Sequence, residues 1–140
     1  MSAEPARKLA VVTCMDARID VYRLLGLELG DAHVIRNAGG LVTDDALRSL
    51  ALSQSLLGTR DVMVIQHTGC GLQGDEEEMR ARVVEATGAD PPSPLGAFPD
   101  VEESVRRQLE TLRSTPYLVE GGTARGYVYD IESGDLREVT

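Results

Sequence analysis

Five side chains in two short segments of the sequence could do chemistry together. Cys14, Asp16 and Arg18 stand in the segment CMDAR, and His67 and Cys70 stand in the segment HTGC. Thiolates and an imidazole suit Zn²⁺ far better than Mg²⁺ or Ca²⁺. Two cysteines and one histidine form a known catalytic zinc set, which leaves a fourth position open. The sequence therefore predicts a metal site made of Cys14, His67 and Cys70.

Two roles are open to Asp16. It could occupy the fourth metal position and close the site, or it could pair with Arg18 and leave that position to water. Arg18 is charged at any relevant pH, so the pair would hold Asp16 ionised and oriented as a hydrogen-bond acceptor. These residues alone do not choose between the two arrangements.

Each piece of this pattern has an ordinary explanation when it is taken singly. A buried cysteine such as Cys14 is more often a packing residue, and an Asp-x-Arg pair is often a surface ion pair worth ~0–1 kcal/mol. Thiol redox chemistry at Cys14 would lack the resolving cysteine of a CxxC motif. The conjunction favours the metal site, because the two cysteines of the chain, one of its two histidines and the Asp-x-Arg pair all follow apolar runs.

Two apolar runs, and a mixed segment between them, predict the strands that position these residues. Leu9–Thr13 and Val62–Gln66 lead into the two segments, and Ala32–Arg36 lies between them. Continuous apolar runs of this length are typical of strands buried on both faces. In a parallel sheet such strands end at the same edge, where ligands bind. If the strands of the two apolar runs are neighbours, all five side chains converge there.

The remaining segments predict an α/β fold with a mostly parallel sheet flanked by helices. Helices are expected from Val21 to Gly26 or Gly30, from the cap Thr43 to just before Gly58 as the C′ residue, over QGDEEEMRARVVEATG, and from the cap Asp100 to just before Pro116. The proline-rich GADPPSPLGAFPD is expected to be a surface excursion. The tail RGYVYDIESGDLREV predicts a C-terminal antiparallel strand pair at the edge of the sheet, with a tight turn at Glu132–Asp135. Residues 1–140 are expected to form one domain.

Composition excludes several function classes. A net charge of −9 disfavours a nucleic-acid partner. No apolar run approaches the ~20 residues of a membrane span, and the segment MSAEPARK lacks the apolar stretch of a secretory signal. A cytoplasmic location is therefore the expectation, and two cysteines are too few for a disulfide scaffold. The second histidine, His33, is expected to be structural or to face solvent.

The pattern CMDAR followed by HTGC resembles the β-class carbonic anhydrases, with their C-x-D-x-R and later H-x-x-C. VIRNAGG and YVYDIESGDL are similar to further family segments, so the resemblance extends from about Leu9 to Val139, and the short chain resembles the compact, archaeal-like branch. It implies a lyase that interconverts CO2 and bicarbonate, one Zn²⁺ per chain on Cys14, His67 and Cys70, and an Asp16–Arg18 dyad. It also implies a homodimer or larger homo-oligomer.

The hypothesis is attack on CO2 by hydroxide generated at zinc, with Asp16 orienting the nucleophile or, in a closed form, ligating zinc itself. One rival is hydrolysis of a related heterocumulene, COS or CS2, at the same site. Another is a zinc- or bicarbonate-binding protein with little activity. The sequence shows neither the pocket shape nor a proton shuttle.

Overall fold

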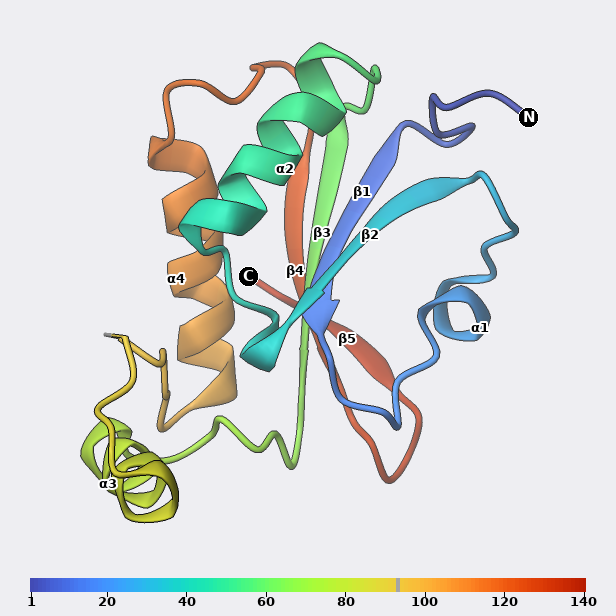
Figure 1. Ribbon diagram of the computed structural model, residues 1–140. Helices are drawn as coiled ribbons and strands as arrows, with labels where there is room; N and C mark the ends of the chain where they lie inside the picture. Colours follow the sequence, from blue (N-terminus) through green and yellow to red (C-terminus); the bar gives the residue numbers. More distant parts are fainter. Residues whose placement is uncertain (93) are drawn as a thin grey trace.

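The computed structural model describes residues 1–92 and 94–140 (Figure 1). The chain alternates strands and helices in the expected manner. Its elements are β1 (Leu9–Cys14), α1 (Val21–Leu25), β2 (Ala32–Asn37), the 3₁₀ turn η1 (Ala38–Gly40), α2 (Asp44–Ser55), β3 (Asp61–His67), α3 (Glu76–Thr87), α4 (Val101–Ser114), β4 (Ala124–Tyr129) and β5 (Leu136–Val139).

The strands form a five-stranded sheet in the order β2-β1-β3-β4-β5. The first four strands run parallel, and β5 pairs antiparallel with β4. The predicted fold class is therefore confirmed, including the C-terminal antiparallel pair. Since β1 and β3 are direct neighbours, with Thr13 aligned to Ile65, the residues that follow them lie at one edge of the sheet.

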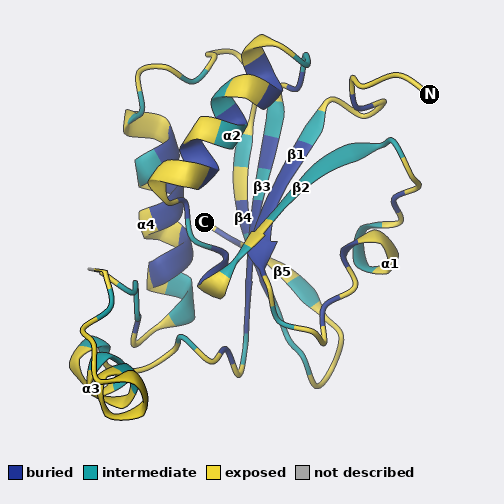
Figure 2. Ribbon diagram, in the orientation of Figure 1, coloured by how far each residue is buried: buried dark blue, intermediate teal, exposed yellow. Residues whose placement is uncertain are grey.

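The central strands β1 and β3 are largely buried on both faces of the sheet, whereas β2 and β5 are more exposed (Figure 2). Leu47 and Leu50 of α2 and Val105 of α4 pack on one face, against alternate strand residues such as Val12 and Val64. On the opposite face, the intervening strand residues pack with α1 and with the connecting segments. Figure 1 shows α2 and α4 together on one side of the sheet and α1 on the other. Because both faces are covered, the sequences of β1 and β3 are continuous apolar runs rather than alternating ones.

Helix caps follow the sequence closely. Thr43 and Asp100 accept hydrogen bonds from the first turns of α2 and α4, as expected. The helix α2 ends one residue earlier than expected, because its cap is Leu56, which donates its N–H to Leu52 at 2.9 Å. Gly58 lies just beyond this cap and takes a left-handed φ of 77°. No helix in the described part of the chain has the length and apolar character to cross a bilayer.

The helix α3 stands apart from the rest of the molecule and buries none of its residues (Figure 2). The proline-rich stretch is a surface excursion, as expected, and the part that falls on Ser93 lies outside the described residues. Glu76 holds this excursion to α3, since its carboxylate accepts hydrogen bonds from the backbone N–H groups of residues 95–97. These donors hold the pKa of Glu76 below its usual range.

Candidate metal centre

The carboxyl ends of β1 and β3 deliver the chemical groups to one place. Cys14 is the last residue of β1 and His67 the last residue of β3. The chain turns after His67, and Gly69 takes a φ of 63°, a conformation that glycine adopts without strain. Thr68 pins the turn by accepting a hydrogen bond from the N–H of Ile131 at 3.0 Å. Cys70 is thereby brought back beside His67.

The three predicted ligands form a compact cluster. Atoms of Cys14, His67 and Cys70 that can bind a metal all lie within 4.8 Å of one another, and all three residues are buried. The two sulfurs are 3.9 Å apart. A disulfide requires about 2.05 Å, whereas sulfurs at 2.3 Å from a tetrahedral zinc ion stand about 3.8 Å apart. The spacing therefore suits a shared metal ion.

The imidazole of His67 is oriented as a ligand. Its Nδ1 lies 2.7 Å from the carbonyl oxygen of Thr68, and because a carbonyl can only accept, Nδ1 must carry the proton. The lone pair then resides on Nε2, which is buried and has no hydrogen-bond partner among the described residues. A buried polar atom is costly when it is unpaired, and a metal ion between the two thiols would satisfy it.

The thiol of Cys70 needs a cation to ionise. Burial is the main cause that raises its pKa, and the neighbouring Cys14 adds to the effect. A bound divalent cation has the opposite effect and lowers the pKa of the thiol, because a coordinating thiol is deprotonated outright. The donor set of two thiolates and one imidazole thus fits zinc.

Asp16 and Arg18 form a tightly bonded pair next to the cluster. Asp16 Oδ1 accepts from the backbone N–H of Arg18 at 2.8 Å and from its Nε at 3.0 Å, and Oδ2 accepts from Nη2 at 2.7 Å. The two residues lie in a turn, in which the N–H of Ile19 donates to the carbonyl oxygen of Asp16 at 3.2 Å. The hydrogen bonds from Arg18 hold the pKa of Asp16 far below its usual range, and the pKa of Arg18 is raised in return.

This pair faces the cluster without joining it. Asp16 Oδ2 lies 3.7 Å from His67 Nε2, yet Asp16 is not part of the metal-binding group among the described residues. Arg18 Nη2 also donates to the carbonyl oxygen of Gly69 at 3.0 Å, so the pair is fixed to the turn that carries Cys70. Of the two arrangements open to Asp16, this conformation is the one paired with Arg18.

Sequence reasoning missed one residue of the site. Arg36, in β2, donates to the carbonyl oxygens of Cys14 at 2.9 Å and of Asp16 at 2.8 Å. It therefore braces the segment between the first ligand and the dyad. The available signal was an arginine that directly follows the apolar residues Val34 and Ile35 in β2. His33, by contrast, bonds to Ser53 at 2.7 Å and belongs to another part of the molecule, as expected.

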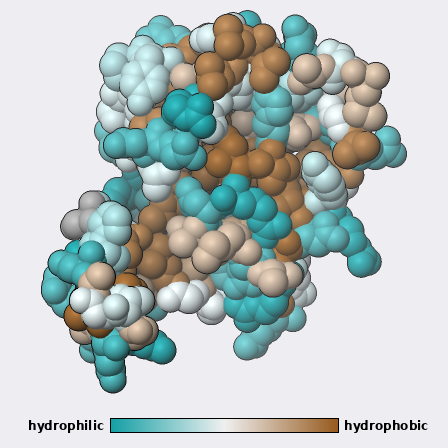
Figure 3. Space-filling model, in the orientation of Figure 1, coloured by the Kyte–Doolittle hydropathy of each residue, from teal (hydrophilic) through white to brown (hydrophobic). Residues whose placement is uncertain are grey.

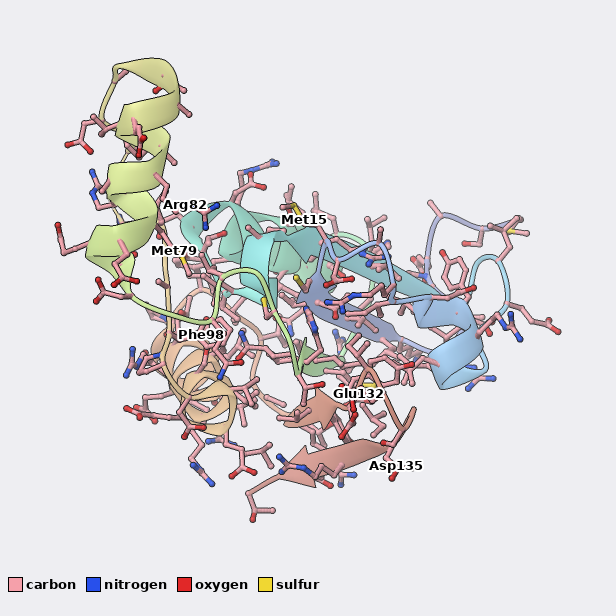
Figure 4. All side chains as sticks on the ribbon, turned by 90° about the horizontal axis from the view of Figure 1, so that it is seen from below. Met15, Met79, Arg82, Phe98, Glu132 and Asp135 are labelled. Carbon is pink, nitrogen blue, oxygen red and sulfur yellow. The ribbon has the colours of Figure 1, made fainter. Side chains whose placement is uncertain are left out.

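The edge of the sheet around the cluster is shown from below in Figure 4. Met15 follows β1 on one side, Glu132 and Asp135 of the β4–β5 turn lie on the other, and α3 projects away. Phe98 is buried in the same apolar cluster as both cysteines. A cavity of about 410 Å³, lined by residues that include Arg18 and Tyr129, opens beside the dyad.

Comparison with known proteins gives a consistent picture. A family model described as carbonic anhydrase matches residues 9–89. The chain is 45% identical over 137 residues to β-carbonic anhydrase 1 of Mycobacterium tuberculosis, covering 97% of this chain and 84% of that protein. A crystal structure of a carbonic anhydrase from Streptococcus mutans superposes with a TM-score of 0.94 at 42% identity, covering 98% of this chain and 84% of that one.

A relative with another named activity is also similar. The chain is 36% identical over 152 residues to a carbon disulfide hydrolase of Acidithiobacillus thiooxidans, covering 94% of this chain and 76% of that protein. Similarity in this range therefore extends to proteins named for two different substrates.

Proposed function

Because the chain belongs to the β-carbonic anhydrase family, we propose that it interconverts CO2 and bicarbonate at a zinc ion held by Cys14, His67 and Cys70. The observation that carries this proposal is the buried Cys-His-Cys cluster with an ionised Asp–Arg pair beside it. A purely structural zinc site would have four protein ligands. Here the described residues supply three, which favours a catalytic site.

Zinc supplies the nucleophile when it is bound: in carbonic anhydrases with three histidine ligands it lowers the pKa of its water to about 7. The chain's own residues prepare the ion's surroundings. The hydrogen bond from His67 Nδ1 to Thr68 fixes the imidazole so that Nε2 faces the metal position. The thiols come from two separate segments, so the site forms only when β1 and β3 are paired.

Asp16 orients the reacting groups and does not act as a proton acceptor. Its depressed pKa keeps it a carboxylate, which can only accept hydrogen bonds and is a weak base. With Oδ2 3.7 Å from His67 Nε2, it can accept a hydrogen bond from a group at the open position. Arg18 fixes the direction of that acceptor through bonds to both carboxylate oxygens.

Carbon disulfide is a second candidate substrate, and the similarity to a carbon disulfide hydrolase is the observation that favours it. Steady-state rates with CO2, COS and CS2 on the same zinc-loaded sample separate the two activities. We expect CO2 hydration to be fastest by orders of magnitude. CS2 hydrolysis together with CO2 hydration no faster than in buffer would contradict the proposal.

We also propose that the protein works in the cytoplasm as a homodimer or larger homo-oligomer. Among the described residues, the edge strand β2 pairs with β1 and with no other strand, and an unpaired strand edge can pair with a second chain. A groove of about 320 Å³ between β2 and α2 is lined by residues that include Ile35 and Leu52. Figure 3 shows apolar surface there and at the end of α2, where Leu56 is exposed. Light scattering should give at least twice the 15.1 kDa chain mass; a monomer would contradict this proposal.

A further inference from the structure

We propose that Gln66 is a positioning residue of the zinc site, which it serves by clamping the turn η1 against the backbone that carries the metal ligands. The inference rests on the proposed zinc function and adds to it a residue outside the ligand set and the dyad. Gln66 precedes His67 in β3, so its side chain points to the opposite face of the sheet and cannot itself reach the metal.

The side chain of Gln66 makes one strong contact. It is fully buried, and its Nε2 donates to the carbonyl oxygen of Gly39 at 2.6 Å. Gly39 belongs to η1, which is 27 positions away in the sequence. Burying a carboxamide has a desolvation cost that an apolar side chain of the same size would not have. The bond to Gly39 offsets part of this cost, while Oε1 of Gln66 is buried with no hydrogen-bond partner among the described residues.

The clamped turn rests directly on the first ligand. Gly40 has a φ of 67°, and a Cβ atom there would lie 2.9 Å from the backbone nitrogen of Cys14 and from the carbonyl carbon of Thr13. Backbone atoms cannot move aside as a flexible side chain can. The close approach therefore fixes the end of β1, and with it the position of the Cys14 sulfur.

The same turn also touches the loop of the third ligand. A Cβ atom on Gly39 would lie 2.6 Å from Cδ2 of Leu72, and the N–H of Leu72 donates to the sulfur of Cys70 at 3.4 Å. Gln66, which precedes His67, is thus connected through η1 to the backbone of Cys14 and to Leu72, whose N–H donates to the sulfur of Cys70.

Two further carboxamides hold the turn from other directions. Asn37 exchanges two hydrogen bonds with the backbone of Leu41, each 2.8 Å long. Gln108 of α4 accepts from the N–H of Val42 at 2.7 Å. The turn is therefore held at three points, of which the bond from Gln66 is the one made to η1 itself.

A matched control exists at the opposite edge of the sheet. Gln54 is also buried, with 6% of its surface exposed, and its Oε1 accepts from the N–H of Val119 at 2.8 Å. It clamps a loop as Gln66 does, but that loop carries no metal ligand. Replacing either glutamine with methionine keeps the length of the side chain and removes the clamp.

The test is the zinc affinity of the Gln66→Met and Gln54→Met variants, measured by competition with a chelator, together with the absorption spectrum of the cobalt-substituted proteins. Loss of an outer partner of a metal ligand typically weakens metal binding by about 10–100-fold. We expect Gln66→Met to raise the zinc dissociation constant by about tenfold and to change the cobalt spectrum. Gln54→Met should leave both unchanged while lowering thermal stability.

Two results would overturn the inference: wild-type zinc affinity and cobalt spectrum in Gln66→Met, or equal weakening in both variants. If Gln66→Met does not fold, Gln108→Met, which releases the same turn at Val42, decides instead. It should weaken zinc binding by a few-fold, and unchanged affinity would contradict the clamp. Failure of the wild-type protein to bind zinc at all would instead contradict the proposed function.

Discussion

Asp16 and Asp61 lie at opposite edges of the same sheet and are similar in their immediate chemistry. Each accepts a backbone and a side-chain hydrogen bond from a residue nearby, Arg18 for Asp16 and Thr123 for Asp61. In each case these donors hold the pKa of the carboxyl below its ordinary value. A depressed pKa therefore does not identify a catalytic carboxylate by itself.

The difference is in what each carboxylate faces. Asp16 Oδ2 lies 3.7 Å from a buried imidazole nitrogen, beside two thiols, whereas Asp61 ties the start of β3 to the segment before β4. Cavity size does not mark the site either. The end of the sheet where β3 begins, near Asp61, is called the amino edge here. It has a cavity of about 470 Å³, lined by residues that include Arg60 and Arg113, but no metal-ligating cluster in the part of the chain that the structure describes.

The largest expected effect is the loss of a ligand at the carboxyl edge. We expect Cys70→Ser to weaken zinc binding by more than ~100-fold, beyond the cost of losing an outer partner, and to abolish CO2 hydration with it. Zinc content and stopped-flow rates on one sample measure both. At the amino edge, Ser53→Ala removes hydrogen bonds to His33 and Thr59, and it should lower stability without changing zinc content. Full activity in Cys70→Ser would show that CO2 hydration does not need the Cys-His-Cys cluster.

The second effect separates the two aspartates. Asp16→Asn should retain zinc but lose about 10²–10³-fold in kcat, the range seen when an oriented electrostatic partner is removed. Asp61→Asn should keep wild-type kcat. If both variants lose kcat equally, or if both keep the wild-type kcat, the proximity of Asp16 to the metal cluster does not determine its role.

The third effect is on stability and its pH dependence. Because the pKa of folded Asp61 is lowered, its stabilising contribution is present above the ordinary carboxyl pKa of about 3.9 and is lost as the pH falls through the lower folded value. Asp61→Asn should therefore melt a few degrees below wild type at about pH 7, and the gap should narrow towards about pH 3. Melting curves at both pH values measure this, and a gap that widens in acid would show that the sign is wrong.

The smallest effect concerns a third carboxylate, Glu76, which lies at neither edge. It holds residues 95–97 to a helix that buries none of its side chains, so its loss should open this region locally rather than unfold the protein. Glu76→Gln should speed hydrogen exchange at these amides and leave zinc content unchanged. A loss of zinc from this variant would show that the excursion supports the metal site.

The sequence was informative where chemistry follows a strand. Cys14 and His67 could be predicted to converge because each ends a continuous apolar run, and a parallel sheet brings such ends to one edge. The antiparallel tail and the caps of α2 and α4 could be predicted for another reason: their signals are local.

What could not be predicted depends on contacts between distant segments. The bond from Gln66 to Gly39 and the contacts of Arg36 with the Cys14–Asp16 backbone join different elements, and no spacing rule encodes them. The turn at Asp16 is a local feature instead: the side chain of Asp16 accepts from the backbone N–H of Arg18. The end of α2 near Gly58 was predictable to within one residue, since the cap is Leu56.

The most direct test is zinc content and CO2 hydration measured on the same preparation of the unmodified protein. We expect about one zinc per chain, loss of activity when a chelator removes the metal, and recovery when one equivalent of zinc is returned. A protein without zinc, with both cysteine thiols titratable and no response to added zinc, would contradict it.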